Sequence, residues 1–125
     1  MPPVTILYVE DSDDLRETIG MLMEAPDRDI TTCATAEEAL AVFAEREFDV
    51  LVTDVSLPGM SGTDMTRKLL ATRPNQWVVL CSGYPFGDAV SQFGPNVRSL
   101  LKPFEPEDLE ALLIDITGKI RDAVN

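Results

Sequence analysis

The stretch VLVTDVSLPGMSG, residues 50–62, decides the fold of this 125-residue chain. It begins as an apolar, β-branched run typical of a buried strand, and it runs straight into the carboxylate of Asp54. A Pro-Gly turn and a second glycine follow. Because carboxylates are rarely fully buried unless they are paired, a strand that leads into one indicates a functional position at the end of that strand.

Strand-like and helix-like runs alternate along the chain. Five short apolar runs predict strands at residues 4–9, 29–33, 49–53, 77–81 and 97–101. Helical spacing of apolar residues follows each of them, in residues 14–25, 35–43, 63–72, 86–93 and from Pro106 onward. Thr35 and Glu38 form a capping box at the start of the second helix. Five βα units whose strands are apolar on both faces predict one α/β domain, with a parallel sheet covered by helices on both sides.

Composition sets the limits of this domain. The length suits a single domain that we expect to span residues 4–122, with residues 1–3 and 123–125 as tails. The net charge of −12 repels phosphate backbones, so direct binding of nucleic acid is not expected. No apolar run is long enough to span a membrane. Cys33 and Cys81 each stand at the end of an apolar run, which favours buried, reduced thiols over a disulfide. We therefore expect a cytoplasmic protein.

The residues that follow the predicted strands are mostly polar. Glu10 and Asp11 follow the first strand, Asp54 the third, Ser82 the fourth and Lys102 the fifth. In an open parallel sheet the functional crevice lies beyond the carboxyl ends of the strands. A flavodoxin-like strand order of 2-1-3-4-5 makes these four strands neighbours, and it places three carboxylates, a hydroxyl and an ammonium around one pocket.

This group of side chains indicates phosphoryl chemistry. Three carboxylates in one pocket repel one another, and Mg²⁺, which prefers oxygen ligands beside a phosphate, compensates them best. The chain has no histidine, so the commonest general base and metal ligand is excluded. A carboxylate nucleophile flanked by Mg²⁺, lysine and a hydroxyl can accept a phosphoryl group as an aspartyl phosphate.

Essentially the whole chain resembles the receiver domain of two-component response regulators. Four motifs carry the resemblance, in order along the chain: Glu10-Asp11, Asp54 with Pro58 and Gly62 behind it, Ser82, and Lys102-Pro103-Phe104. The peptide bond between the lysine and the proline is usually cis in this family, so the resemblance implies a cis Lys102–Pro103 bond.

The resemblance also implies roles for these residues. Asp11 and Asp54 would bind Mg²⁺ directly, Glu10 would do so through water, and the backbone carbonyl of Ser56 would complete the set. Asp54 would take the phosphoryl group from a phosphohistidine on a histidine kinase or a histidine phosphotransfer protein. Lys102 and Ser82 would then hold the phosphoryl oxygens. The chain would assist its own phosphorylation and dephosphorylation without being an enzyme, would signal to a downstream protein, and could dimerise when phosphorylated.

One position departs from the family pattern. Receivers commonly carry an aromatic residue three positions before the lysine, which swings inward when the hydroxyl moves, and here that position is Ser99. Our hypothesis is that Tyr84, two residues after Ser82, takes the aromatic part of the switch. The alternative is that the segment from Phe86 to Phe93 reorders as a whole.

Three other functions share parts of this sequence pattern. A flavodoxin-type FMN binder would need a Ser/Thr/Gly-rich phosphate loop after the first strand, where this chain has acids. A phosphatase of the haloacid-dehalogenase type would need a second aspartate at position 56, which is a serine. The main alternative is a receiver fold that binds proteins without being phosphorylated. Ser99 favours this alternative, whereas the intact set of acids argues against it.

Overall fold

The structure is a computed structural model, and it describes residues 2–124. Along the chain it places the following elements: β1 (Val4–Val9), α1 (Asp13–Met23), β2 (Arg28–Cys33), α2 (Ala36–Glu45), β3 (Val50–Asp54), α3 (Gly62–Thr72), β4 (Trp77–Ser82), the 3₁₀-helix η1 (Gly87–Gln92), β5 (Val97–Leu101) and α4 (Pro106–Val124). The strands are parallel, in the predicted order β2-β1-β3-β4-β5.

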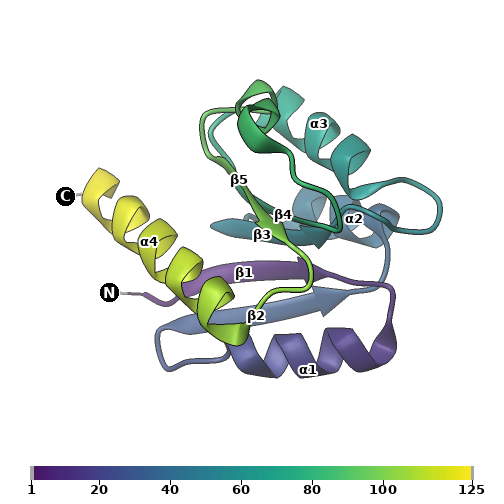
Figure 1. The fold of residues 1–125 in the computed structure, drawn as a ribbon. Coiled ribbons are helices and arrows are strands. Elements are labelled where there is room, and N and C mark those ends of the chain that lie inside the picture. Colours follow the sequence, from purple (N-terminus) through teal and green to yellow (C-terminus); the bar gives the residue numbers. More distant parts are fainter. Residues whose placement is uncertain (1, 125) are drawn as a thin grey trace.

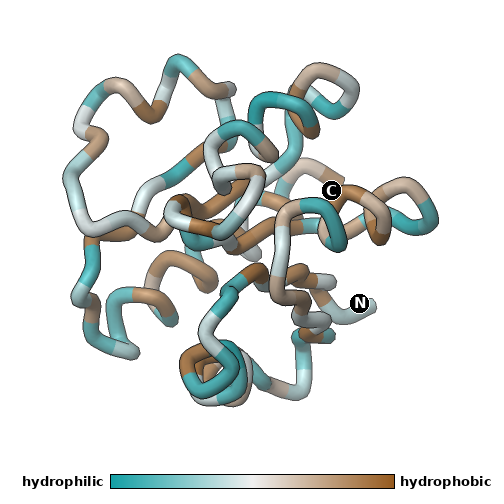
Figure 2. Tube along the Cα trace, turned by 90° about the vertical axis from the view of Figure 1, so that its right-hand side faces the viewer, coloured by the Kyte–Doolittle hydropathy of each residue, from teal (hydrophilic) through white to brown (hydrophobic). Residues whose placement is uncertain are grey.

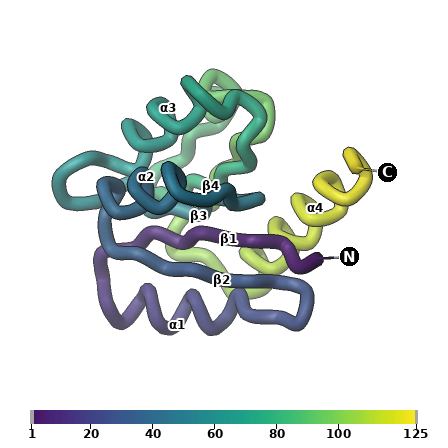
Figure 3. The backbone as a smooth tube through the Cα atoms, turned by 180° about the vertical axis from the view of Figure 1, so that it is seen from behind, coloured from purple at the N-terminus to yellow at the C-terminus, as the bar shows by residue number. Residues whose placement is uncertain are grey.

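The molecule has three layers. In Figure 1 α4 passes in front of the sheet, and in the view from behind in Figure 3 α2 does. Two separate cores result, because alternate residues of each strand point to opposite faces. Leu7, Leu51 and Leu80 belong to the core beneath α2 and α3, whereas Ile6 and Val52 belong to the core beneath α1 and α4. The hydropathy colours in Figure 2 accordingly gather apolar segments at the centre of the molecule.

Not every strand is apolar on both faces. The prediction is wrong for the two edge strands, since only Cys33 of β2 and only Val97 of β5 are buried. An edge strand has a neighbour on one side only and lies at the margin of the helix layers. The three central strands carry the cores. They also deliver the acids Glu10, Asp11 and Asp54 and the hydroxyl of Ser82 to the carboxyl end of the sheet.

Two helices differ from their predicted form. α1 ends at Met23 rather than at residue 25, because Ala25 precedes Pro26 and a residue before proline disfavours helical backbone. Its Leu15 and Leu22 are half exposed, because Gly20 and Met23 face the sheet instead. The helix expected over residues 86–93 is the short η1, in which no residue is buried. Across residues 2–124, no helix combines the length and the apolar character that crossing a membrane requires.

Candidate functional site

Asp54 is the last residue of β3, rather than the first residue after it as expected. Its neighbours Val50 and Val52 point into the core beneath α1 and α4, so the alternation of the strand directs Asp54 to that same face, at the end where the core opens. The register pairs Val9 of β1 with Thr53, which brings Glu10 beside Asp54. Asp54 is 7% exposed.

The two acids after β1 join Asp54 in one cluster. One carboxylate oxygen each from Glu10, Asp11 and Asp54 lies within 4.8 Å of the others. Asp11 is exposed, whereas Glu10 is buried. Burial raises the pKa of Glu10, and the charge of Asp54 acts in the same direction, against the hydrogen bond that the Ser12 backbone N–H donates to Glu10. A cation at this point would remove the repulsion between the three groups.

Lys102 supplies a positive charge to the same place. Its Nζ lies 3.0 Å from Oδ1 of Asp54. Its backbone N–H donates to the carbonyl of Ser82 at 2.7 Å, which ties the end of β5 to the end of β4. The Lys102–Pro103 bond is cis, as the resemblance implied. The backbone of Lys102 is therefore fixed by its bond to β4, and its side chain forms an ion pair with Asp54.

The loop after β3 is closely fitted to Asp54. The backbone N–H of Ser56 donates to Oδ1 of Asp54 at 3.3 Å, and Gly62 N–H donates to the carbonyl of Val55 at 2.9 Å. A Cβ on Gly62 would lie 2.1 Å from the backbone oxygen of Asp54. Only glycine fits there, which gives a steric reason for a glycine eight residues after the aspartate.

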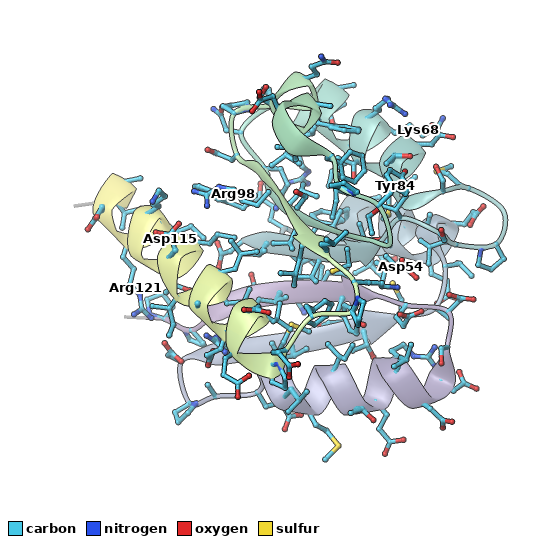
Figure 4. The ribbon with its side chains drawn as sticks, in the orientation of Figure 1. Asp54, Lys68, Tyr84, Arg98, Asp115 and Arg121 are labelled. Carbon is cyan, nitrogen blue, oxygen red and sulfur yellow. The ribbon has the colours of Figure 1, made fainter. Side chains whose placement is uncertain are left out.

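Ser82 is near the cluster, but its hydroxyl is engaged elsewhere. Ser82 Oγ donates to the carbonyl of Tyr84 at 2.8 Å and accepts from the Tyr84 N–H at 3.0 Å. Tyr84 is 52% exposed as a residue, and its ring packs on Phe86 with centroids 5.2 Å apart. Figure 4 shows Tyr84 and Asp54 toward the same end of the sheet. Ser99 is exposed on β5.

One residue at the site was missed by sequence reasoning. The Nη1 of Arg16, in α1, donates to the backbone carbonyl of Glu10 at 2.9 Å. This bond fixes the backbone at the start of the turn that carries Glu10 and Asp11. No sequence pattern indicates this contact, because it depends on how α1 packs back against the end of β1.

The donor set fits Mg²⁺. Hard divalent cations prefer carboxylate and carbonyl oxygens, and Mg²⁺ typically binds through one or two carboxylates and keeps several waters. Three carboxylates of this chain converge, two of them buried and one exposed, and neither a thiol nor an imidazole competes in the cluster of described residues.

Comparison with known proteins agrees with this geometry. The family described as the response regulator receiver domain matches residues 6–114. This chain belongs to that family. A cyclic di-GMP phosphodiesterase of Thermotoga maritima is 30% identical over 122 residues, which are 97% of this chain and 32% of that protein. The probable transcriptional regulatory protein TcrX of Mycobacterium tuberculosis is 38% identical over 78 residues, 62% of this chain and 33% of that protein.

Solved structures share the receiver fold. The receiver of an HD domain-containing protein from Pseudomonas fluorescens has a TM-score of 0.84 at 21% identity, covering 96% of this chain and 98% of that one. The DrrB receiver domain, solved as BeF₃-activated, has a TM-score of 0.79 at 28% identity, covering 93% and 98%. This receiver domain spans about a third of the length of the curated relatives named above.

Proposed function

We propose that this receiver domain, acting through residues 4–122, accepts a phosphoryl group on Asp54 and thereby changes its protein-binding surface. The donor is a phosphohistidine of a histidine kinase or a histidine phosphotransfer protein. The observation that carries the proposal is the convergence of Glu10, Asp11 and Asp54, with the Lys102 ammonium 3.0 Å from the Asp54 carboxylate. The BeF₃-activated DrrB receiver is a relative of the same fold that was brought into an activated state.

In the transfer an oxygen of Asp54 attacks phosphorus, the new P–O bond forms and the P–N bond to the donor imidazole breaks. Asp11 and Asp54 would hold Mg²⁺ directly, Glu10 would do so through water, and the Ser56 carbonyl would complete the set. When bound, this ion would neutralise charge on the phosphoryl oxygens. Lys102 exchanges its contact with the Asp54 carboxylate for one with a phosphoryl oxygen.

Ser82 carries the change outward. Its hydroxyl releases the Tyr84 carbonyl and donates to a phosphoryl oxygen, which frees the turn at residues 82–84. Because Ser99 has no ring to swing, the rearrangement passes through Tyr84 and its contact with Phe86, or through the segment 86–93 as a whole. NMR with Mg²⁺ and BeF₃⁻ tests this route, since unchanged surroundings of both Tyr84 and Ser99 would contradict it.

Intact mass spectrometry tests the transfer itself. The protein is incubated with Mg²⁺ and acetyl phosphate beside the variant Asp54→Asn. We expect one added phosphoryl group in the parent, and none in the variant or without Mg²⁺. If the folded parent gains nothing from acetyl phosphate or from a phosphohistidine donor, the chain is instead a binding module that works without phosphorylation.

A further inference from the structure

The loop that follows Asp54 is held at its tip by a side chain from another part of the chain. Glu37, in the first turn of α2, accepts a hydrogen bond at Oε2 from the backbone N–H of Met60, at 3.2 Å. Asp54 and Thr63, which adjoin the loop 55–61 in sequence, also bond to it through their side chains. Within residues 2–124, Glu37 provides the side-chain hydrogen bond that reaches this loop from an element distant in sequence. The base of the loop is closed separately, by the bond between Gly62 and Val55.

The helix end does not itself require Glu37. The capping needs of α2 are met by Thr35, whose hydroxyl accepts from the Glu38 N–H at 3.1 Å, and by Glu38, whose carboxylate accepts from the Ala34 N–H at 3.4 Å. An acid in a first helical turn is favoured by the helix dipole in any case. The helix dipole does not explain why the Glu37 carboxylate points away from its own helix and bonds to the loop.

The loop is shaped to receive this carboxylate. Gly59 has a φ of +74°, which side-chain-bearing residues rarely adopt, and a Cβ at this position would lie 3.0 Å from Oε2 of Glu37. Glycine at 59 therefore gives the loop its turn and also leaves room for the carboxylate. The turn and the hydrogen bond at Met60 depend on each other.

We infer that Glu37 is a positioning residue for the acidic site, acting through the loop. With its tip bound to α2 and its base closed on Val55, the loop presents the Ser56 N–H to Oδ1 of Asp54 in one orientation. The Ser56 carbonyl, which would face the cation in the proposed function, belongs to the same loop. Freeing the tip lets this backbone sample other conformations, so the oxygens are less well arranged before a cation binds.

The test measures Mg²⁺ affinity from the backbone amide NMR signals of Ser56 and Leu57, with hydrogen exchange of the Met60 amide as a second readout. We expect Glu37→Ala to weaken Mg²⁺ binding about three- to tenfold and to accelerate Met60 exchange by a similar factor, the range that one net hydrogen bond provides. Glu37→Gln keeps an acceptor oxygen and should restore most of both values.

Glu38→Ala is the matched control. It removes the same charge one residue further along α2 and removes the bond from the Ala34 N–H, so it should lower stability while leaving Mg²⁺ affinity and Met60 exchange at the parent values. Parental Mg²⁺ affinity in Glu37→Ala, or an equal loss in Glu38→Ala, would overturn the inference. The inference rests on the proposed function, so a parent protein that binds no Mg²⁺ would overturn the proposed function and the inference together. A parent that binds Mg²⁺, but no more tightly than Glu37→Ala does, would overturn the inference alone.

Discussion

Two segments follow the carboxyl ends of the neighbouring central strands β3 and β4, and they differ in how firmly contacts with the rest of the fold hold them. The loop 55–61 after β3 is closed by backbone bonds, fitted around Gly62 and tied to α2 through Glu37. The segment 83–96 after β4 contains η1, which has no buried residue, and it rests on α3 mainly through ring contacts. Phe86 packs edge-on against Phe93, which lies under the Arg67 guanidinium.

This contrast separates two tasks. Chemistry at Asp54 requires atoms that are already in place, so a closely held loop suits it. A change of surface requires a segment whose alternative conformations lie close in free energy, and such segments have few buried contacts. The receiver places the two segments side by side, because the register of β3 and β4 pairs Asp54 with Cys81, the residue before Ser82.

Hydrogen exchange should show the largest difference between the two regions. Amides of β3 and β4 lie in the buried sheet and exchange only when most of the fold opens, whereas the Ala89 and Phe93 amides bond within an exposed 3₁₀ turn. We expect protection factors that differ by about 10³ or more, measured by NMR at neutral pH. Equal protection in η1 and in β4 would remove the contrast.

A glycine pair tests the same difference in free energy of unfolding. Gly62→Ala forces a Cβ against the Asp54 backbone oxygen, and we expect a loss of about 1–3 kcal/mol or more in urea unfolding. Gly83→Ala is the matched change after β4, where a Cβ meets nothing within 4 Å, and it should stay within about 0.5 kcal/mol of the parent. Similar losses in both variants would show that the two segments are equally constrained.

Ser82→Ala should have a smaller and more local effect. The substitution removes the two hydrogen bonds between the hydroxyl and the Tyr84 backbone, whose freed groups can turn to water because Tyr84 is exposed. We expect a stability loss of about 1 kcal/mol, with faster exchange confined to residues 83–86. Faster exchange in the loop 55–61 as well would mean that the two regions are coupled more tightly than their contacts suggest.

Tyr84→Ala should change stability least. The residue is half exposed and its aromatic neighbour is Phe86, so we expect a loss of about 0.5 kcal/mol or less by thermal or urea unfolding. The same variant should alter the response of the segment 86–93 to BeF₃⁻, which distinguishes a signalling role from a packing role. A large stability loss would instead make Tyr84 part of the core.

The parts of the fold that rest on local pattern were predictable from sequence. Alternating runs predicted the five strands, and the motifs placed Asp54 and Lys102 together at the carboxyl end of the sheet. Thr35 caps α2 as predicted, whereas the Glu38 carboxylate accepts from the N–H of Ala34 and not, as a capping box requires, from that of Thr35. Strand order came from the flavodoxin-like topology that we assumed for five βα units, because single strands do not encode their neighbours.

The parts that failed depend on how elements meet. The apolar spacing of α1 includes Met23, which is buried, but it does not reveal that Gly20 also faces the sheet and that Leu15 and Leu22 are half exposed. The contact of Glu37 with Met60 joins residues 23 apart, and a glutamate in a first helical turn looks the same whether or not it reaches a loop. Tertiary geometry decides such roles, and local sequence does not record them.

The turn that engages Ser82 also sets a threshold for signalling. An oxygen that draws the hydroxyl away must compensate the bond donated to the Tyr84 carbonyl and the bond accepted from its N–H, together about 1–3 kcal/mol. In the proposed function, a cation among the carboxylates would offer the hydroxyl no acceptor and would leave the turn closed. A phosphoryl group on Asp54 would offer one, so the turn would open in response to the modification and not to the cation alone.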